Sequence, residues 1–573
     1  MLITRRNTVF AGLAGGTAAC VSKPELGRFS SAGSSANTAF SCGIASGDPA
    51  ADSVVLWTRV EGNNSGRIPV DVEVAEDATF ARVVWQQRSE TGPERDYTVK
   101  VVADGLEPGR QYAYRFRALG ATSPIGKTKT LPEETERVRF AVVSCSNYNF
   151  GYFNAYDHIA RDADFDAVIH LGDYFYEYGP DGYGGEAGIA VGRPHDPARE
   201  TLTLDDYRRR HRQYKRDGAA QRMHAAHGMI AIWDDHETSN DSFKDGAENH
   251  QPTSEGDWAG RKRAAMQAYY EYMPVREPEP GRLREQLFRS YSWGRFLTLP
   301  IIESRLTARD HPVAYDQYLP QLTGPEALEN FVRDVLGDPS RELLGAEQLA
   351  YVEEALETSV ARGDTWRVIG NQVMMARVKS PDLLPFLTEE QIQEFEVGFP
   401  QIRGFLAIGQ LGLPLNTDAW DGYPAARERF YAKAQAAGAR DLVVITGDTH
   451  QFWANDLVTE DGTKMGVELG TAGVTSPGAS AYLGEAAFDV TLLLRRDNPD
   501  VRYTDAYSKG YISLEFNQDK ARSEFISMST IASPDYTAIR SASFDLEQKD
   551  GSVSFERFQG LGFKERVLFG RSA

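Results

Sequence analysis

The sequence predicts a layered α/β domain preceded by an all-β domain. Short β-rich runs separated by turns fill the chain up to residue 131, and apolar runs that alternate with helical patterns follow them. The length of 573 residues also exceeds what one hydrophobic core usually spans. We therefore expect a β domain over residues 39–131 and a larger α/β domain over residues 137–560.

The first domain is predicted to be a β-sandwich. About seven short runs suit a sandwich of this kind. Aromatic residues occupy alternate positions after the Pro-Gly turn at residues 108–109, so residues 106–117 resemble the penultimate strand of a fibronectin type III or immunoglobulin-like domain. The clearest runs are residues 53–59, 70–74, 82–85 and 97–102.

The second domain is predicted from buried strands that alternate with helices, as in layered α/β folds. The apolar runs are residues 138–143, 167–171, 229–233, 297–302, 366–369 and 442–445. The helical patterns cover residues 152–161, 204–216, 260–273, 346–358 and 425–437.

Residues 1–20 have the pattern of an export signal. Arg5-Arg6 precedes a short apolar stretch that ends at Cys20 and is too short to span a membrane. The arginine pair suggests the twin-arginine route, and residues 17–20 resemble a lipoprotein cleavage box in which Thr17 replaces the usual apolar residue. We expect a periplasmic or extracellular protein, anchored by lipid on Cys20 or released by ordinary cleavage nearby.

The formal net charge of −20 argues against an electrostatic grip on nucleic acid, because such binding depends on Lys and Arg. The basic run at residues 207–216 is therefore interpreted as a solvated helix face. The tyrosines at positions 269, 270 and 272 are predicted to pack in the interior. An acidic protein that acts on phosphate needs local positive charge, which clustered carboxylates can supply by binding metal.

Polar residues gather directly after several of the apolar runs, where α/β sheets place their ligands. An Asp that caps a helix or a lone buried His is the more common explanation for any one of them. Their recurrence after successive strands favours a shared site. The groups are Ser-Cys-Ser-Asn-Tyr (144–148), Gly-Asp-Tyr-Phe-Tyr-Glu (172–177), Trp-Asp-Asp-His-Glu-Thr-Ser-Asn (233–240) and Thr-Gly-Asp-Thr-His (446–450).

These motifs resemble the alkaline phosphatase D (PhoD) family of the metallophosphoesterase superfamily. Gly-Asp-x-x-Tyr (172–176) is shared with purple acid phosphatases, which would show Gly-Asn-His in place of Asp234-Asp235-His236 and an Asp near Cys145. Ser-Cys-x-x-Tyr-x-x-Gly-Tyr-Phe (144–153), Trp-Asp-Asp-His-Glu (233–237) and Gly-Asp-x-His (447–450) are similar to PhoD. So is the opening of the β domain, at residues 42–49 and 54–59.

The resemblance implies a metallophosphoesterase-like β-sandwich core flanked by helices, and a metal centre within it. Fe³⁺ would be bound by the thiolate of Cys145, the carboxylate of Asp173, the phenolate of Tyr176 and the imidazole of His450. Binding to iron would explain why Cys145 has no disulfide partner. Ca²⁺ would take oxygen ligands from Asp173, Asp235, Asp448 and Asn240, with Asp173 bridging and the choice between Asp235 and Asn240 open. Zn²⁺ or Mn²⁺ are the alternative metals.

A hydroxide between the metals would then attack phosphorus in line. His236 and Arg305 would be catalytic, steadying phosphate oxygens or protonating the leaving group, and Asn371 would help to bind the substrate. Gln372 suits an orienting role. Glu303-Ser304 replaces the Asp-Thr that commonly precedes the family's arginine, which leaves the choice of substrate open.

The resulting hypothesis is a secreted, monomeric, metal-dependent phosphoesterase that hydrolyses small phosphate mono- and diesters. A PhoD-like phospholipase D or phosphotriesterase is the alternative within the same chemistry. A surface binding protein with a dead catalytic domain is the alternative outside it. A serine hydrolase is disfavoured because no Gly-x-Ser-x-Gly motif stands at a strand-to-helix turn.

Overall fold

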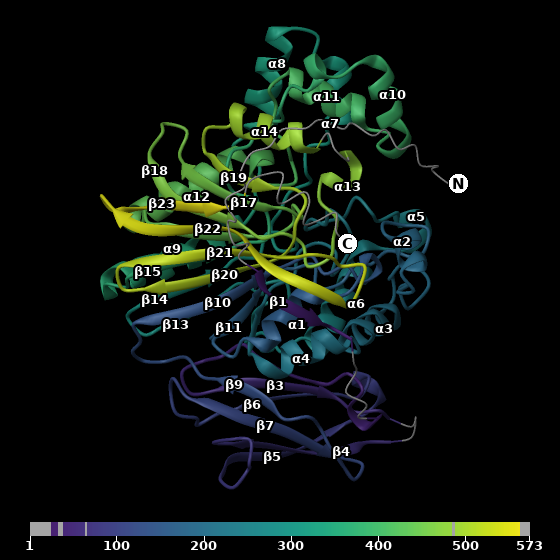
Figure 1. The fold of residues 1–573 in the computed structure, drawn as a ribbon, viewed down its shortest axis with the longest axis vertical. Coiled ribbons are helices and arrows are strands. Elements are labelled where there is room, and N and C mark those ends of the chain that lie inside the picture. The colour runs from purple at the N-terminus through teal and green to yellow at the C-terminus, as the bar shows by residue number, and fades with distance from the viewer. Residues whose placement is uncertain (1–24, 33–37, 63–65, 484–486, 562–573) are drawn as a thin grey trace, which may run out of the picture.

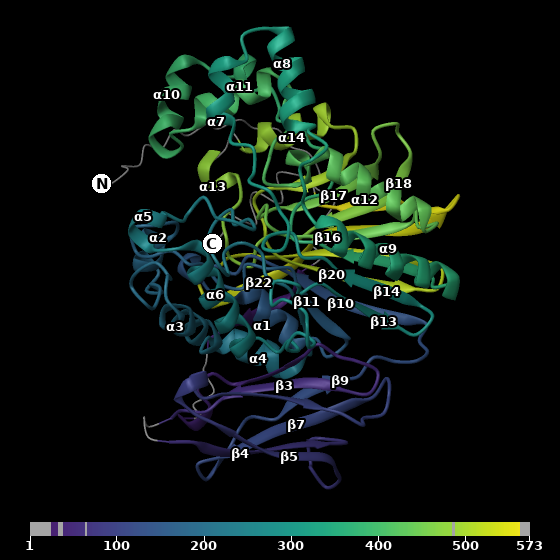
Figure 2. The same cartoon turned by 180° about the vertical axis from the view of Figure 1, so that it is seen from behind.

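The computed structural model describes residues 25–32, 38–62, 66–483 and 487–561, which fold into three β-sheets and the helices that cover them (Figures 1 and 2). The predicted export signal and Cys20 lie outside the described residues. Within the described part of the chain, no helix combines the length and the apolar composition that crossing a membrane requires. The mixed α/β architecture agrees with the coarse prediction from the sequence.

The N-terminal strands enclose an apolar core of their own, at the bottom of Figure 1. Val54 and Leu56 of β3 meet Val72 of β4 and Phe116 of β7 in this core, because alternate side chains of each strand point inward. The five-stranded sheet contains β4 (Ile68–Ala75), β5 (Val83–Thr91), β7 (Gln111–Ala118), β8 (Ala121–Thr122) and β9 (Gly126–Lys129). The facing strands are β2 (Ile44–Gly47), β3 (Val54–Arg59) and β6 (Thr98–Ala103).

These facing strands also belong to an eleven-stranded sheet, because β2 pairs with β12 through Gly47 and Met229. In this sheet β10, β11 and β12 run parallel, and the C-terminal strands add antiparallel to β10. Its other strands are β1 (Glu25–Ser30), β10 (Arg137–Val143), β11 (Ala167–His170), β12 (Met229–Ala231), β20 (Lys509–Asn517), β21 (Lys520–Met528), β22 (Asp535–Lys549) and β23 (Ser552–Gly560).

A seven-stranded sheet packs against the parallel part of the first. Val142 and Ile169 of the first sheet share one core with Leu299, Val443 and Val467 of the second. Strands β14, β15, β16 and β18 run parallel. The seven strands are β13 (Arg289–Trp293), β14 (Leu297–Ile301), β15 (Trp366–Gly370), β16 (Leu442–Thr446), β17 (Phe452–Val458), β18 (Lys464–Gly470) and β19 (Val501–Asp505).

Helices cover the outer faces of this pair of sheets. Val352 of α9 and Phe430 of α12 pack on Ile369 and Val444, whose neighbours in the strands face the inner core. Helices α7, α8, α10 and α11 form a helical region at the top of Figure 1. The helices are α1 (Asn154–Arg161), α2 (Gly185–Ala190), α3 (Leu204–Lys215), α4 (Gly218–Ala226), α5 (Pro252–Glu255), α6 (Trp258–Tyr272), α7 (Tyr315–Tyr318), α8 (Pro325–Phe331), α9 (Gly345–Arg362), α10 (Glu389–Gly398), α11 (Ile402–Gln410), α12 (Pro424–Ala436), α13 (Ser480–Leu483) and α14 (Ala487–Asp497).

One local prediction was wrong. The basic run on α3 is not a solvated face throughout, since Arg210 and Lys215 are buried. Arg210 donates to the backbone carbonyls of Tyr176 and Tyr178, so it fastens the turn that follows β11. The tyrosines of α6 at positions 269, 270 and 272 are buried, as predicted.

Candidate metal centre

The turns that follow the parallel strands meet at one edge of the two sheets. Cys145 N–H donates to the carbonyl of Gly172 at 3.1 Å, which joins the turns after β10 and β11. Gly447 N–H donates to the carbonyl of Gln372 at 2.8 Å, which joins the turns after β16 and β15. The indole of Trp233, after β12, donates to Glu303, after β14, at 2.9 Å and links the two sheets. The polar groups noted in the sequence therefore share one region.

Four residues of these turns adopt a left-handed backbone, which side chains other than glycine rarely accept. The φ angles are 58° at Cys145, 54° at Asp173, 62° at Asp448 and 59° at His450. Each such residue costs about 1–3 kcal/mol, and strain of this kind concentrates at functional sites. All four are among the ligands expected from the sequence.

The first group of candidate ligands contains Cys145, Asp173 and His450, whose ligand atoms all lie within 4.8 Å of one another. Tyr176 joins them, since its hydroxyl lies 2.8 Å from Oδ2 of Asp173 and 3.0 Å from Nε2 of His450. Cys145 is buried and not in a disulfide. The structure thus brings together every residue expected to bind Fe³⁺.

Neighbouring groups orient two of these side chains. The carbonyl of Pro477 lies 3.0 Å from Nδ1 of His450, so Nδ1 carries the proton and Nε2 presents a lone pair toward the group. The hydroxyl of Ser476 donates to the Tyr176 oxygen at 2.7 Å. Ser476 and Pro477 come from the segment after β18, which the sequence did not mark.

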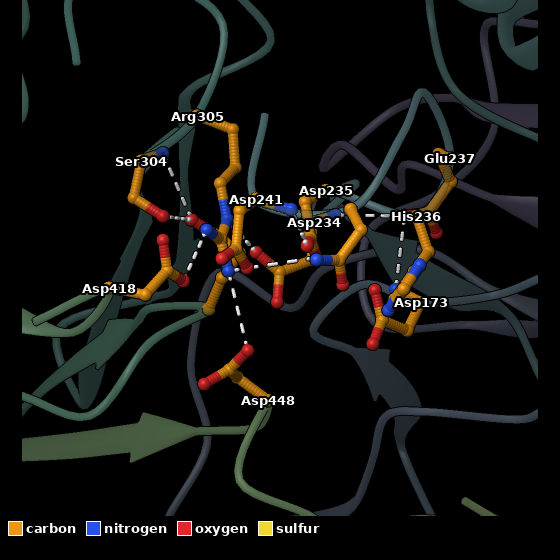
Figure 3. A network of polar contacts seen from close by, with 12 residues as sticks. Asp173, Asp234, Asp235, His236, Glu237, Asp241, Ser304, Arg305, Asp418 and Asp448 are labelled. Carbon is orange, nitrogen blue, oxygen red and sulfur yellow. Dashed lines mark hydrogen bonds and ion pairs between the residues drawn. The ribbon is translucent and has the colours of Figure 1, made fainter. Parts of the chain in front are cut away.

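Two further groups of candidate ligands extend the centre. Asp173 belongs to one of them as well as to the group with Cys145 and His450. One comprises Asp173, Asp235 and His236, and the other comprises Asp234, Asp235 and Asp448, each with ligand atoms within 4.8 Å (Figure 3). Among the described residues, no hydrogen-bond donor reaches Oδ1 of Asp173 or Oδ2 of Asp234, although both atoms are buried. The buried Oδ1 of Asp235 has an ion pair with Arg305, at 3.6 Å, in place of a hydrogen bond. Buried carboxylate oxygens without donors fit hard cations such as Ca²⁺.

Burial and mutual repulsion disfavour the negatively charged forms of the side chains in the centre. Burial, together with the neighbouring carboxylates Asp235 and Asp234, raises the pKa of Asp173 well above its ordinary value. Burial and Asp234 do the same to the pKa of Asp448. The pKa values of the Cys145 thiol and the Tyr176 phenol also rise, through burial and the charge of Asp173. A bound cation would favour the deprotonated forms of all these groups.

Arg305 places a positively charged side chain among the carboxylates of the centre. Its buried guanidinium pairs with Asp234, with Asp418 at 2.5 Å and with Asp448 at 3.3 Å (Figure 3). Glu303 accepts the N–H of Arg305 at 2.8 Å and so shapes the turn that carries it. In this arrangement Arg305 neutralises the carboxylates, a role that the sequence interpretation had not included.

The side chain of Gln372 holds the same turn. Its Oε1 accepts the N–H of Ser304 at 3.0 Å and the hydroxyl of Ser304 at 2.6 Å. Its Nε2 donates to the carbonyl of Ile302 at 2.6 Å. Gln372 therefore orients the residues that precede Arg305.

His236 forms a buried dyad with Glu177. Nδ1 of His236 lies 2.7 Å from Oε2 of Glu177, and its ring lies 4.0 Å from the ring of Tyr176 between centroids. Burial lowers the pKa of His236, but the charges of Asp235, Asp173 and Glu177 outweigh burial and raise it well above its ordinary value. His236 is thus suited to hold a proton beside the carboxylates.

Two expected residues have other partners. The side-chain amide of Asn240 donates to Glu248 at 3.2 Å. The amide of Asn371 is fully buried, donates to the carbonyl of Val373 at 2.6 Å and accepts from the indole of Trp420 at 3.5 Å. Because both ends of the Asn371 amide bind interior groups, we withdraw its assignment as a substrate ligand.

Three carboxylates of the centre were missed in the sequence. Asp234 could have been found beside Asp235. Asp241 donates its backbone N–H to Asp235 at 2.6 Å, and burial with the charges of Asp418 and Asp235 raises its pKa well above its ordinary value. Asp418 lies in a loop with no preceding strand, so no sequence pattern marks it.

Comparisons with known proteins show the family to which the chain is similar. The sequence model described as "PhoD-like phosphatase" matches residues 140–525, and the one described as "PhoD-like phosphatase, N-terminal domain" matches residues 27–132. The chain is 33% identical over 527 residues to alkaline phosphatase D of Bacillus subtilis (strain 168), which covers 89% of this chain and 81% of that protein. A solved structure of PhoD matches with a TM-score of 0.74 and 29% identity, over 94% of this chain and 98% of that chain.

Proposed function

The chain belongs to the PhoD-like phosphatase family and is a phosphoesterase, and on that premise we propose that it hydrolyses small phosphate mono- and diesters outside the cytoplasm. The observation that carries the proposal is the convergence of one thiol, one phenol, two imidazoles and several carboxylates from distant turns. An active rather than a dead catalytic domain is supported by the left-handed backbone at four proposed ligands and by the buried Oδ1 of Asp173 and Oδ2 of Asp234, which lack donors among the described residues.

The proposed centre has two parts. Cys145, Asp173, Tyr176 and His450 would hold Fe³⁺, because thiolate and phenolate are strong donors to a highly charged cation. Asp173, Asp235 and Asp448, now joined by Asp234, would hold Ca²⁺ through oxygen atoms, with Asp173 shared. Asn240 remains a proposed ligand on the sequence resemblance alone. When bound, these cations would supply Lewis acidity and a hydroxide nucleophile at neutral pH.

The protein's own residues would carry the proton and the charge. His236, held by Glu177 at 2.7 Å, would donate its proton to the departing alkoxide. Arg305 would neutralise the negative charges of Asp234, Asp418 and Asp448. Its positive charge would also attract the oxygens of a phosphate that enters the site. No side chain would form a covalent bond with phosphorus.

The organisation of the chain is part of the proposal. An immunoglobulin-like N-terminal domain over residues 39–131 is supported by its separate apolar core, and a metallophosphoesterase-like domain over residues 137–560 by two sheets that share a core between helices. The signal-like sequence of residues 1–20 supports the proposed periplasmic or extracellular location, with or without lipid on Cys20. We propose a monomer.

Hydrolysis assays test this function. Protein exported by its own host, so that its metals are intact, is to be assayed on a phosphomonoester, a diester and a triester with the same leaving group. We expect turnover of the mono- and diester that is lost with a chelator. Selective turnover of the triester or of a phospholipid would support the alternative substrates, and no turnover of any ester would refute the proposal.

A further inference from the structure

The carboxylate of Glu237 accepts three backbone N–H groups from two ligand-bearing turns. Figure 3 shows Glu237 beside Asp173 and Asp234, which belong to these two turns. Oε1 accepts the N–H of Tyr174 at 2.6 Å. Oε2 accepts the N–H of Asp173 at 3.0 Å and the N–H of Asp234 at 2.9 Å. The side chain is buried, with 2% of its surface exposed.

The three amides belong to the turns that carry the proposed cation ligands. Asp173 and Tyr174 follow β11, whereas Asp234 follows β12 and precedes Asp235. Gly172 lets these turns touch, because a Cβ at this position would lie 2.3 Å from Cβ of Asp234 and 2.4 Å from its nitrogen. The φ of 101° at Gly172 likewise favours glycine.

A carboxylate is an unexpected choice here on electrostatic grounds. The charge of Glu237 adds to the repulsion that already raises the pKa of Asp173. Burial raises the pKa of Glu237 itself, and the backbone N–H groups of Tyr174, Asp234 and Asp173 oppose this rise because they stabilise the carboxylate form. A carboxylate is nevertheless the side chain that can accept three N–H groups on two oxygens without presenting a donor to any of them. Its position is therefore explained by geometry.

We propose that Glu237 is a positioning residue, which fastens the turn of Asp173 to the turn of Asp234 and Asp235 and so sets the spacing of the cation ligands. This inference rests on the proposed function, because it assumes that these aspartates bind a cation. Glu237 is not itself a proposed cation ligand, because its two oxygens accept backbone N–H groups. Its effect passes through the two turns, as outer-shell groups affect the metals whose ligands they orient.

Glu468 offers a matched control. It is also fully buried, and its carboxylate accepts the N–H of Met375 at 2.5 Å and that of Ala376 at 3.2 Å. It further accepts the side-chain amide of Asn455 at 2.8 Å. Glu468 thus makes the same kind of contacts with turns that carry no proposed ligand.

The experiment compares the full chain with E237Q and E468Q after chelator treatment. An amide at position 237 would set an NH2 group against a backbone N–H, so the fastening would weaken while the shape of the side chain stays. We expect both variants to lower the melting temperature in chelator. Only E237Q should weaken Ca²⁺ binding, measured by titration calorimetry, by about 10- to 100-fold.

A second measurement needs no variant. In hydrogen exchange of the metal-free protein, the backbone amides of Asp173, Tyr174 and Asp234 should stay protected, because Glu237 rather than the cation accepts their N–H groups. Ca²⁺ affinity of E237Q equal to that of the unmodified chain, or rapid exchange of these amides, would overturn the proposal. Failure of the unmodified chain to bind Ca²⁺ would instead count against the proposed function.

Discussion

The hydroxyl of Tyr176 lies 3.0 Å from Nε2 of His450, although 274 residues separate the two in the chain. Tyr176 follows a strand of one sheet and His450 follows a strand of the other. Their meeting depends on both sheets being packed with their parallel strands in the same direction. It therefore ties the proposed cation centre to the fold itself.

Replacing Tyr176 with Phe should weaken iron binding by at least about 10-fold, because the phenolate is a proposed ligand while the ring still packs on His236. The visible absorption expected of an iron–phenolate bond should disappear. Absorption spectra and elemental analysis would measure both effects. The control is Tyr178→Phe, whose ring lies 5.5 Å from that of His236 but which is not a proposed ligand. An unchanged spectrum in Tyr176→Phe would show that another group binds the iron.

Replacing His236 with Gln should lower kcat by about 10²- to 10⁴-fold for an ester with an alkyl leaving group, because the proton donor is lost. The loss should be much smaller for a nitrophenyl ester, whose leaving group needs no proton. Rates on the two esters measure the difference. Equal losses on both would indicate that His236 binds substrate rather than donating a proton.

Replacing Arg305 with Ala should destabilise the metal-free protein by about 3–5 kcal/mol, because buried carboxylates lose their partner. Ca²⁺ should restore more stability to this variant than it adds to the unmodified chain. Thermal unfolding with and without Ca²⁺ tests this. Arg367→Ala, which breaks the pair with Asp441 away from the centre, should be destabilised without such rescue. Equal Ca²⁺ effects on the two variants would contradict the assigned role.

The fold was largely readable from the sequence where strands and helices show clear periodicity. The apolar runs before residue 446 became β10, β11, β12, β14, β15 and β16, and polar residues that follow them were identified as candidate metal ligands, catalytic residues or substrate-binding residues. The C-terminal strands β20 to β23 were not predicted, although they extend the first sheet. Their place beside β10 depends on pairing over hundreds of residues, such as Val138 with Phe516, which no local pattern reveals.

Part of the site could also be predicted from the sequence, because some of its residues directly follow strands with a clear apolar pattern. Cys145, Asp173, Tyr176 and His450 follow strands within recognisable motifs. Asp418 and Ser476 come from loops whose contribution exists only after the sheets pack. The sequence also could not show that the Asn371 amide is used within the core, because that depends on the indole of Trp420.

Lys215 predicts a pH dependence of stability. Its ammonium lies 3.0 Å from Nε2 of His224 and over the rings of Trp57 and Tyr174, and burial lowers its pKa to about 7. Between pH 7 and the unfolded pKa of about 10.4, the unfolded chain binds more protons, so this residue makes stability rise with pH. Lys215→Met should flatten that rise. Identical slopes for variant and unmodified chain between pH 7 and 9 would contradict the prediction.

The proposed function depends on side chains from turns far apart in the chain that jointly bind cations. Anomalous X-ray scattering from crystals of the protein exported by its own host tests it most directly, with data on both sides of the iron absorption edge. We predict an iron peak within bonding distance of Cys145 Sγ, the Tyr176 oxygen and His450 Nε2, and a lighter cation among Asp173, Asp235 and Asp448. A map with no cation near these side chains would contradict the account.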